Sequence, residues 1–318
     1  MSALGRAIAG LVAALSMATP TLDRSPANGV LSARGRSGPA EIEASGGVLT
    51  LASRSSQMIL VPRSKFTMGS TYDDVVAALA ECQAETPGHR CDATKFSDET
   101  PQHTVTLSAY WLDRFEVTVA EYARCASLSR CNALPLRDGA RRFDHPSYPA
   151  SLVSWEEARA YCAFRGARLP TEEEFERAAR GTSGRRFPWG NLYNSRVSNH
   201  GAYDWSDPLA LVGGNPTDSR DGFVELAPVG SFPSGRTPEG FMDLAGNVAE
   251  WIDDRYVPHY DEGGTPDPAT RRPGSPTRVI RGGSYESGPL SLRGASRDEA
   301  FPNMRRPSVG FRCAKSRD

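Results

Sequence analysis

The sequence predicts an irregular α+β domain with short helices, a low content of regular secondary structure and long ordered loops. Three observations support this prediction. Glycine and proline supply 30 and 24 of the 318 residues, which is typical of a chain rich in loops and turns. Helix-start signals open only a few segments of about ten residues, and the strand-like stretches are short and scattered. A helical bundle and a coiled coil are therefore excluded.

Three helices are expected to begin at capping boxes, in which a Ser or Thr hydroxyl and a Glu three residues later satisfy each other's backbone amides. The pairs are Thr118 with Glu121, Ser154 with Glu157, and Thr171 with Glu174. Gly166 and Gly181 would end the second and third helices, since glycine is common just past a helix C-terminus. A weaker helix is expected over residues 73–81.

Strands are expected where short apolar stretches adjoin turn formers. The candidate strands span residues 58–61, 103–107, 111–115, 223–229 and 278–283. A turn and a second short strand should follow the first of them. Most of residues 182–240 is expected to be ordered loop.

The N-terminal residues have the features of an export signal. Arg6 precedes an apolar run over residues 7–18, which matches a signal peptide and is too short to span a membrane. A frayed helix of a cytosolic protein is the alternative. Residues 19–56 are rich in Ser, Gly, Ala and Arg, so a flexible linker is expected there. The prediction is a signal peptide over 1–18, a linker over 19–56 and one domain over 57–316, exported to the periplasm or the medium.

Charge and hydropathy exclude two classes of partner. Lys plus Arg total 37 and Asp plus Glu total 38, so the chain lacks the surplus of cations that nucleic-acid binding requires. No apolar run approaches the ~20 residues that span a bilayer, so no membrane span is expected.

The cysteine count agrees with an oxidising compartment. The six cysteines are Cys82, Cys91, Cys125, Cys131, Cys162 and Cys313. An even number fits three disulfides, although spacing alone allows about fifteen connectivities. Turn formers between the first two cysteines and between the next two favour local pairs, and the last two would then close a long loop. Metal ligation is the weaker alternative, because the sequence has no Cys-x-x-Cys and no His pair at i, i+4 spacing.

Two acidic segments have the composition of calcium sites. Residues 240–251 place Asp243, Asn247 and Glu250 around Gly246, and oxygen ligands on a turn suit a hard cation such as Ca²⁺. A polar turn that caps a following helix is the alternative. The second segment holds Asp218, Asp221, Gly222 and Phe223, with Asn199 earlier in the chain. It is not an EF-hand, because the bidentate Glu that ends such a loop is missing.

A glycine-rich turn near the C-terminus could line a cleft. It presents Ser284, Tyr285, Glu286 and Ser287. The turn is not a nucleophile elbow, because Glu286 stands where the last glycine would be needed, and no Lys-Ser/Thr follows as in a phosphate loop. Four arginines come soon after: Arg293, Arg297, Arg305 and Arg306. They would form either an anion-binding cleft or a solvated, ion-paired face.

Seven motifs occur in the order seen in one known family. They are KFTMGS, DRFEVTVAEYARC, VSWEEARAYCAFRGARLPTEEEFERAARG, RFPWGN, GFMDLAGNVAEW, RVIRGGSYES and VGFRCA. Over about residues 57 to 315 the chain resembles the formylglycine-generating enzyme (sulfatase-modifying factor) family, which also includes domains of ergothioneine-pathway sulfoxide synthases and pyoverdine-maturation proteins. The resemblance implies an irregular, C-type-lectin-like α+β fold.

The resemblance also assigns roles to individual residues. It implies a disulfide between Cys162 and Cys313. One calcium site would use the side chains of Asn199 and Asp221 with backbone oxygens at His200 and Phe223. A second calcium site would use Asp243 and Glu250 with the carbonyls of Gly246 and Val248, and Glu99 resembles a further acidic position of the family.

The family's copper chemistry does not extend to this chain. Formylglycine generators hold Cu(I) between two cysteines that follow the GGSY turn, because Cu(I) requires soft thiolates. Here Ser287 stands at the first of these positions, and the stretch PLSL runs through the region of the second. No copper is therefore expected. Calcium, bound at the two acidic segments, is the expected cofactor.

Three hypotheses about the function of this chain can be compared. The first is an exported, calcium-stabilised module that binds a peptide or small molecule. The second is a non-canonical enzyme, similar to the pyoverdine-maturation branch, whose cleft would be lined by Ser284, Tyr285, Glu286, Ser287, Arg293 and Arg297. Whether any catalysis survives is open at this point, because no general base paired with Glu286 is visible. The third, strict oxidation of cysteine to formylglycine, is disfavoured by the missing cysteine pair.

Overall fold

The computed structural model describes residues 31–35, 38–45, 48–53, 56–85, 91, 94–136, 138–201, 219–260 and 275–317. The expected signal peptide and Asp218 lie outside these residues. The described helices are α1 (Tyr72–Glu85), α2 (Thr94–Ser97), α3 (Val119–Ser127), α4 (Trp155–Phe164) and α5 (Glu172–Arg180), with short 3-10 helices at Asp138–Phe143, Pro233–Gly235 and Pro289–Leu292. None of the helices in this part of the chain is both long and apolar enough to cross a membrane.

The described strands form three sheets. They are β1 (Leu31–Gly35), β2 (Gly38–Ser45), β3 (Val48–Ser53), β4 (Ser56–Val61), β5 (Ser64–Met68), β6 (His103–Leu107), β7 (Tyr110–Asp113), β8 (Ala249–Arg255), β9 (Arg278–Arg281), β10 (Arg297–Ala300), β11 (Val309–Gly310) and β12 (Ala314–Ser316). The strand orders are β1-β2-β3-β4-β7-β12, β10-β9-β8-β11 and β5-β6. The β8–β11 pair is parallel, and the other strand pairs are antiparallel.

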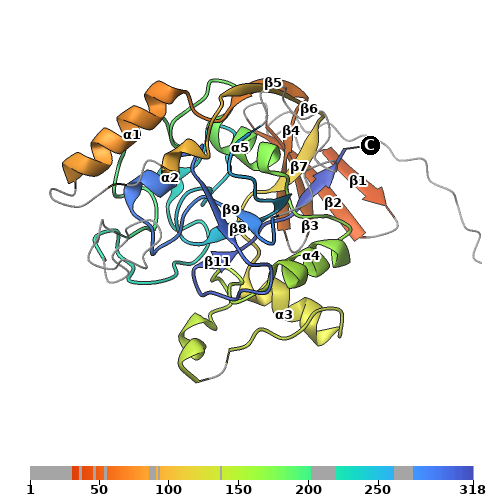
Figure 1. Ribbon diagram of the computed structural model, residues 1–318. Coiled ribbons are helices and arrows are strands. Elements are labelled where there is room, and N and C mark those ends of the chain that lie inside the picture. Colours follow the sequence, from red (N-terminus) through yellow and green to blue (C-terminus); the bar gives the residue numbers. More distant parts are fainter. Residues whose placement is uncertain are drawn as a thin grey trace, which may run out of the picture.

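Strand β8 forms the centre of the molecule. Because alternate side chains of a strand point to opposite faces, Trp251 packs into one hydrophobic cluster and Ile252 into another. Helix α4 supplies Tyr161 to the first cluster, and helix α5 supplies Phe175 to the second. In Figure 1 the two helices accordingly lie on either side of β8 and β9. The short α+β elements thus enclose two cores that share strands β4, β8 and β9.

The capping-box predictions are confirmed. The side chains of Thr118, Ser154 and Thr171 each accept a hydrogen bond from the backbone amide of the Glu three residues later, and their own backbone amides donate to the carboxylate of that Glu. The expected weak helix is also present as α1, and it is longer than predicted.

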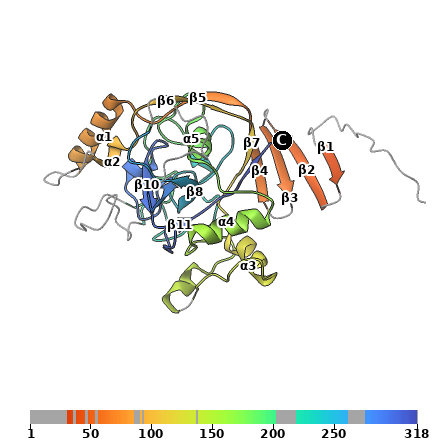
Figure 2. The same ribbon diagram turned by 45° about the vertical axis from the view of Figure 1, so that its right-hand side comes forward.

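The structure differs from the expected linker over residues 19–56. Within that range β1, β2 and β3 extend the large sheet from β4, and Figure 2 shows them beside β4 and β7, away from α1 and α2. The sequence contains a signal for this arrangement: the two glycines at positions 46 and 47 separate two stretches of alternating apolar and polar residues, a pattern typical of a hairpin.

The strand predicted over residues 223–229 is wrong, because these residues form loop and turn. Some of the backbone groups of this segment are hydrogen-bonded by side chains, and the Val229 amide donates to the Ser147 carbonyl at 2.9 Å. The side-chain amide of Asn199 donates to the Glu225 carbonyl at 2.8 Å, and the Asn247 side-chain oxygen accepts from the backbone amide of Ala227 at 2.9 Å.

Candidate functional site

The glycine-rich turn after β9 is tied together by its own serines. Positive φ angles at Gly282 (92°) and Gly283 (66°) turn the chain sharply after the strand. The Ser284 amide then donates to Ser287 Oγ at 2.9 Å, the two hydroxyls lie 3.3 Å apart, and the Glu286 amide donates to Ser284 Oγ at 3.2 Å. The Ser287 hydroxyl is thus engaged within the turn.

Tyr285 and Glu286 differ in exposure. Tyr285 is buried beside Phe143, Leu226 and Val248, and its amide donates to the Asn247 carbonyl at 3.0 Å. Burial raises the pKa of Tyr285, and the Glu286 carboxylate adds to this effect. Glu286 itself is only half-buried, so of these two side chains it is the more open to a ligand.

Arg293 and Arg297 do not line an open cleft. Both are buried, and Arg293 binds both oxygens of Glu99 at 2.8 and 2.6 Å. Arg297 binds Glu172 at 2.6 and 3.1 Å. Their carboxylate partners lie far away in the sequence. The sequence alone therefore could not decide between an anion-binding cleft and an ion-paired face.

Glu99, expected as an acidic position of the calcium sites, is part of the same ionic network. Besides its pair with Arg293, its carboxylate accepts a hydrogen bond from the Ser70 hydroxyl at 2.6 Å. These contacts satisfy the carboxylate from within the protein.

The residues of the first candidate calcium cluster lie close together. The Asp221 carboxylate accepts from the amides of His200 at 2.8 Å and Phe223 at 2.9 Å, which fixes it against both segments. Within the described residues, no hydrogen bond is accepted by the Asn199 side-chain oxygen or by the carbonyls of His200 and Phe223. Three of the four expected ligand groups therefore have oxygens without a protein partner here.

The second cluster lies directly beside the first. The Asn247 amide donates to the Asn199 carbonyl at 2.7 Å, and the two side chains are joined by a 3.0 Å hydrogen bond. Among the described residues the carbonyls of Gly246 and Val248 accept no hydrogen bond. The Glu250 carboxylate, by contrast, is held by two hydrogen bonds of 2.7 Å from Arg312.

Sequence reasoning missed Glu116, which belongs to this cluster. Its Oε1 accepts from the Asn247 side chain at 3.0 Å, whereas its Oε2 is buried and has no partner among the described residues. Burial raises the pKa of Glu116 well above its usual range, and the neighbouring Asp243 and Glu250 charges raise it further against the opposing effect of Arg312. The motif around Glu116 was recognised, but nothing local indicated its distant partners.

Any metal ion at these motifs would need amide and carbonyl oxygens in addition to carboxylates. In the described part of the chain, no three His, Cys, Asp or Glu side chains are grouped so that they could hold a metal ion. Ca²⁺ commonly accepts such mixed ligand sets, so the residues present are compatible with calcium.

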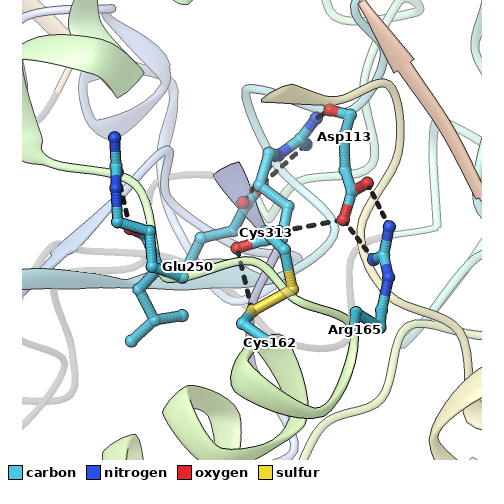
Figure 3. The surroundings of a disulfide bond; sticks show 8 residues. Asp113, Cys162, Arg165, Glu250 and Cys313 are labelled. Carbon is cyan, nitrogen blue, oxygen red and sulfur yellow. Dashed lines mark hydrogen bonds and ion pairs between the residues drawn. A yellow bond between two sulfur atoms is a disulfide. The ribbon is translucent and has the colours of Figure 1, made fainter. Parts of the chain in front are cut away.

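Three disulfides link Cys82 with Cys91, Cys125 with Cys131, and Cys162 with Cys313, as the local pairs and the resemblance predicted. Figure 3 shows the last disulfide next to Asp113, whose carboxylate accepts from Arg165 at 2.6 and 2.9 Å and from the Cys313 amide at 2.9 Å. All six cysteines are paired, so no thiol remains for a metal.

A comparison with known protein families identifies the family to which this chain belongs. The model of the sulfatase-modifying factor enzyme 1-like domain matches residues 48–317. The chain belongs to this family. Family membership confirms the predicted resemblance, and the match begins within β3, ahead of the predicted domain start.

Two relatives of this sulfatase-modifying factor family protein differ in activity. This chain is 32% identical over 296 residues to a formylglycine-generating enzyme of Streptomyces coelicolor, and the match covers 82% of this chain and 89% of the relative. It is 37% identical over 176 residues to a mouse protein described as an inactive Cα-formylglycine-generating enzyme 2, covering 53% of this chain and 49% of that protein.

A solved structure has the same overall fold. The structure of PvdO from Pseudomonas aeruginosa superimposes with a TM-score of 0.61 at 26% identity, covering 82% of this chain and 95% of PvdO. The irregular α+β fold predicted from the sequence is therefore confirmed.

Proposed function

We propose that this chain is an exported, calcium-stabilised member of the family that binds a peptide or small molecule and does not convert cysteine to formylglycine. The observation that carries the proposal is Ser287, whose hydroxyl bonds to Ser284 at the position where the family resemblance places a copper thiolate. A hydroxyl is hard and stays protonated near neutral pH, so it is a poor substitute for a thiolate on Cu(I). The disulfides occupy every cysteine, and the mouse relative described as inactive offers a precedent.

Charge balance supports the calcium part of the proposal. The carboxyl groups of Glu116, Asp243 and Glu250 are buried close to one guanidinium, that of Arg312. When all three are ionised, the cluster has an excess of negative charge, which is costly in a buried site unless protons or a cation neutralise it. The unpaired oxygens of Glu116, Gly246 and Val248 would be available to a cation. Disulfides are compatible with the exported location.

The activity test uses a peptide with a Cys-x-Pro-x-Arg motif, copper and oxygen, followed by mass spectrometry. The Streptomyces coelicolor enzyme is the positive control. We expect the cysteine to remain unmodified, and formation of the aldehyde would overturn the proposal. Elemental analysis and a thiol count on the same protein should find calcium, no copper and no free thiol.

A second candidate function is a non-canonical enzyme that modifies an exported, peptide-derived substrate. The similarity to PvdO over most of both chains favours it, since one fold can host several chemistries. Glu286, half-buried in the turn, would then be the group best placed to transfer a proton. Stoichiometric copper or iron in the elemental analysis would favour this candidate over the binding module.

A further inference from the structure

A surface recess of about 350 Å³ is lined by none of the residues of the glycine-rich turn or the calcium motifs. Its lining residues are Trp189, Pro233, Ser234, Arg236, Thr237 and Pro238. The recess combines an indole and two proline rings with the exposed Ser234 hydroxyl and one guanidinium. Recognition sites for peptides and small molecules commonly have this mixture of apolar surface and a few polar groups.

The aromatic wall of the recess is held in place from behind. The Trp189 indole stacks on Phe187 with ring centroids 5.1 Å apart and planes 4° from parallel, and its Nε1 donates to the Leu192 carbonyl at 2.9 Å. Phe187 also packs against Leu292, which ends the PLSL stretch that runs through the region of the family's second copper cysteine. Phe187 covers one face of the indole, and Trp189 as a whole remains half-buried and lines the recess.

The other lining residues lie in a hydrogen-bonded turn over residues 233–238. Thr237 is fully buried, its amide donates to the Phe241 carbonyl at 2.9 Å, and its hydroxyl accepts from the Phe241 amide at 3.2 Å. Gly235 packs so closely that a Cβ there would lie 1.9 Å from the Val197 carbonyl oxygen. A preformed wall loses little conformational entropy when a ligand binds.

Arg236 is the charged residue among those that line the recess. Its side chain is exposed, and within the described part of the chain its guanidinium makes no hydrogen bond or ion pair. Nearby Arg185 is instead paired with Glu239 at 2.9 Å. An unpaired guanidinium that lines the same recess as an aromatic ring favours a ligand with both a carboxylate and a ring, since Arg binds carboxylates through two parallel hydrogen bonds.

We propose that this recess binds an extended peptide by stacking an aromatic side chain on Trp189 and pairing an adjacent carboxylate with Arg236. Offset stacking of the two rings provides apolar burial, and the ion pair sets the specificity. The inference rests on the proposed binding function and names the class of ligand that the module takes.

The test measures the affinity of short peptides, N-acetylated and C-amidated, by fluorescence anisotropy. The probe has a Tyr-Glu centre between Gly and Ser, and the controls have Tyr-Lys or Ala-Glu centres. We expect the wild-type protein to bind Tyr-Glu at least about tenfold more tightly than either control. Equal binding of the three peptides, or no binding of Tyr-Glu, would overturn the proposal.

Charge reversal tests the pairing directly, because an inverted preference requires a folded protein, and the melting temperature of each variant is measured to show that it is folded. Arg236→Glu should invert the preference so that Tyr-Lys binds more tightly than Tyr-Glu, whereas the matched control Arg63→Glu, at another exposed arginine, should bind as wild type. Loss of binding to both peptides in Arg236→Glu would contradict a pairing role for Arg236. If the peptides fail while calcium is present and no aldehyde forms, only this inference fails and the proposed function stands.

Discussion

Gly246 makes the contact between the two candidate calcium motifs. It has a φ of +85°, a region that L side chains rarely adopt, and a Cβ at this position would lie 2.2 Å from the Asn199 carbonyl oxygen. That carbonyl accepts the Asn247 amide at 2.7 Å. A glycine is therefore required both by the backbone conformation and by the close approach of the two segments.

Replacement of this glycine tests the contact. Gly246→Ala should lower the free energy of unfolding by roughly 2–5 kcal/mol, because backbone strain and overpacking act together. Gly166→Ala is the matched control: it has a φ of +68° but no atom within 4 Å of the added Cβ, so its cost should be only about 1 kcal/mol. Denaturant unfolding measures both, and equal losses would show that the approach to Asn199 is not restrictive.

At the level of elements, the N-terminus of α4 is joined to a distant loop. Glu157 closes the capping box with Ser154 and also binds Arg305 through two hydrogen bonds of 2.9 Å. Burial alone would raise the pKa of Glu157, but the hydrogen bonds from Arg305, Ser154 and Asn132 outweigh burial and lower the pKa from 4.5 to about 2.

This lowered pKa predicts a stability profile at acid pH. A carboxyl whose pKa is lower in the folded state stabilises the protein above pH 4.5, and the contribution disappears as the pH falls to about 2. Glu157→Gln should lower the unfolding free energy at pH 7, and its difference from wild type should shrink through that pH range. Urea unfolding at several pH values measures it. A difference that does not depend on pH would contradict the assigned ionisation.

The same element shows which features the sequence could predict. A capping box is local, since its two side chains are three residues apart, and all three boxes were found from the sequence. Ionic partners such as Glu99 for Arg293 are 194 residues apart, so no local pattern identifies them. Strand β8 was missed for a related reason. It is buried on both faces, so its sequence lacks the alternation that marks a half-exposed strand.

For the whole molecule, the Cys162–Cys313 disulfide closes the chain on itself. It joins α4 to the residue before β12 over a separation of 151 residues, whereas Cys125–Cys131 spans only 6. Because a cross-link restricts the unfolded chain more when its loop is longer, loop entropy assigns about 5 kcal/mol to the first and about 2 kcal/mol to the second. The long-range bond is therefore expected to dominate.

Paired substitutions test this difference. Cys162→Ala with Cys313→Ala should lower the unfolding free energy by about 3 kcal/mol more than Cys125→Ala with Cys131→Ala. Denaturant unfolding of both variants under identical conditions gives the comparison. Similar losses in the two variants would mean that local packing, and not loop closure, sets the contribution.

Calcium should act on the stability of the entire domain, because the two candidate sites join segments around residues 199, 221 and 246 that are distant in sequence. A ligand that binds only the folded state stabilises it in proportion to the logarithm of its concentration, by about 4 kcal/mol at a thousand times its dissociation constant. Chelation with EGTA is therefore expected to lower the melting temperature, and added Ca²⁺ to restore it more effectively than Mg²⁺, which prefers a smaller octahedral site.

Two variants test which carboxylate is responsible. Asp221→Asn should weaken the response to calcium, whereas Asp73→Asn, which changes an exposed carboxylate on α1, should leave it intact. A melting temperature unaffected by EGTA would show that the unpaired oxygens at the two motifs do not bind a stabilising cation.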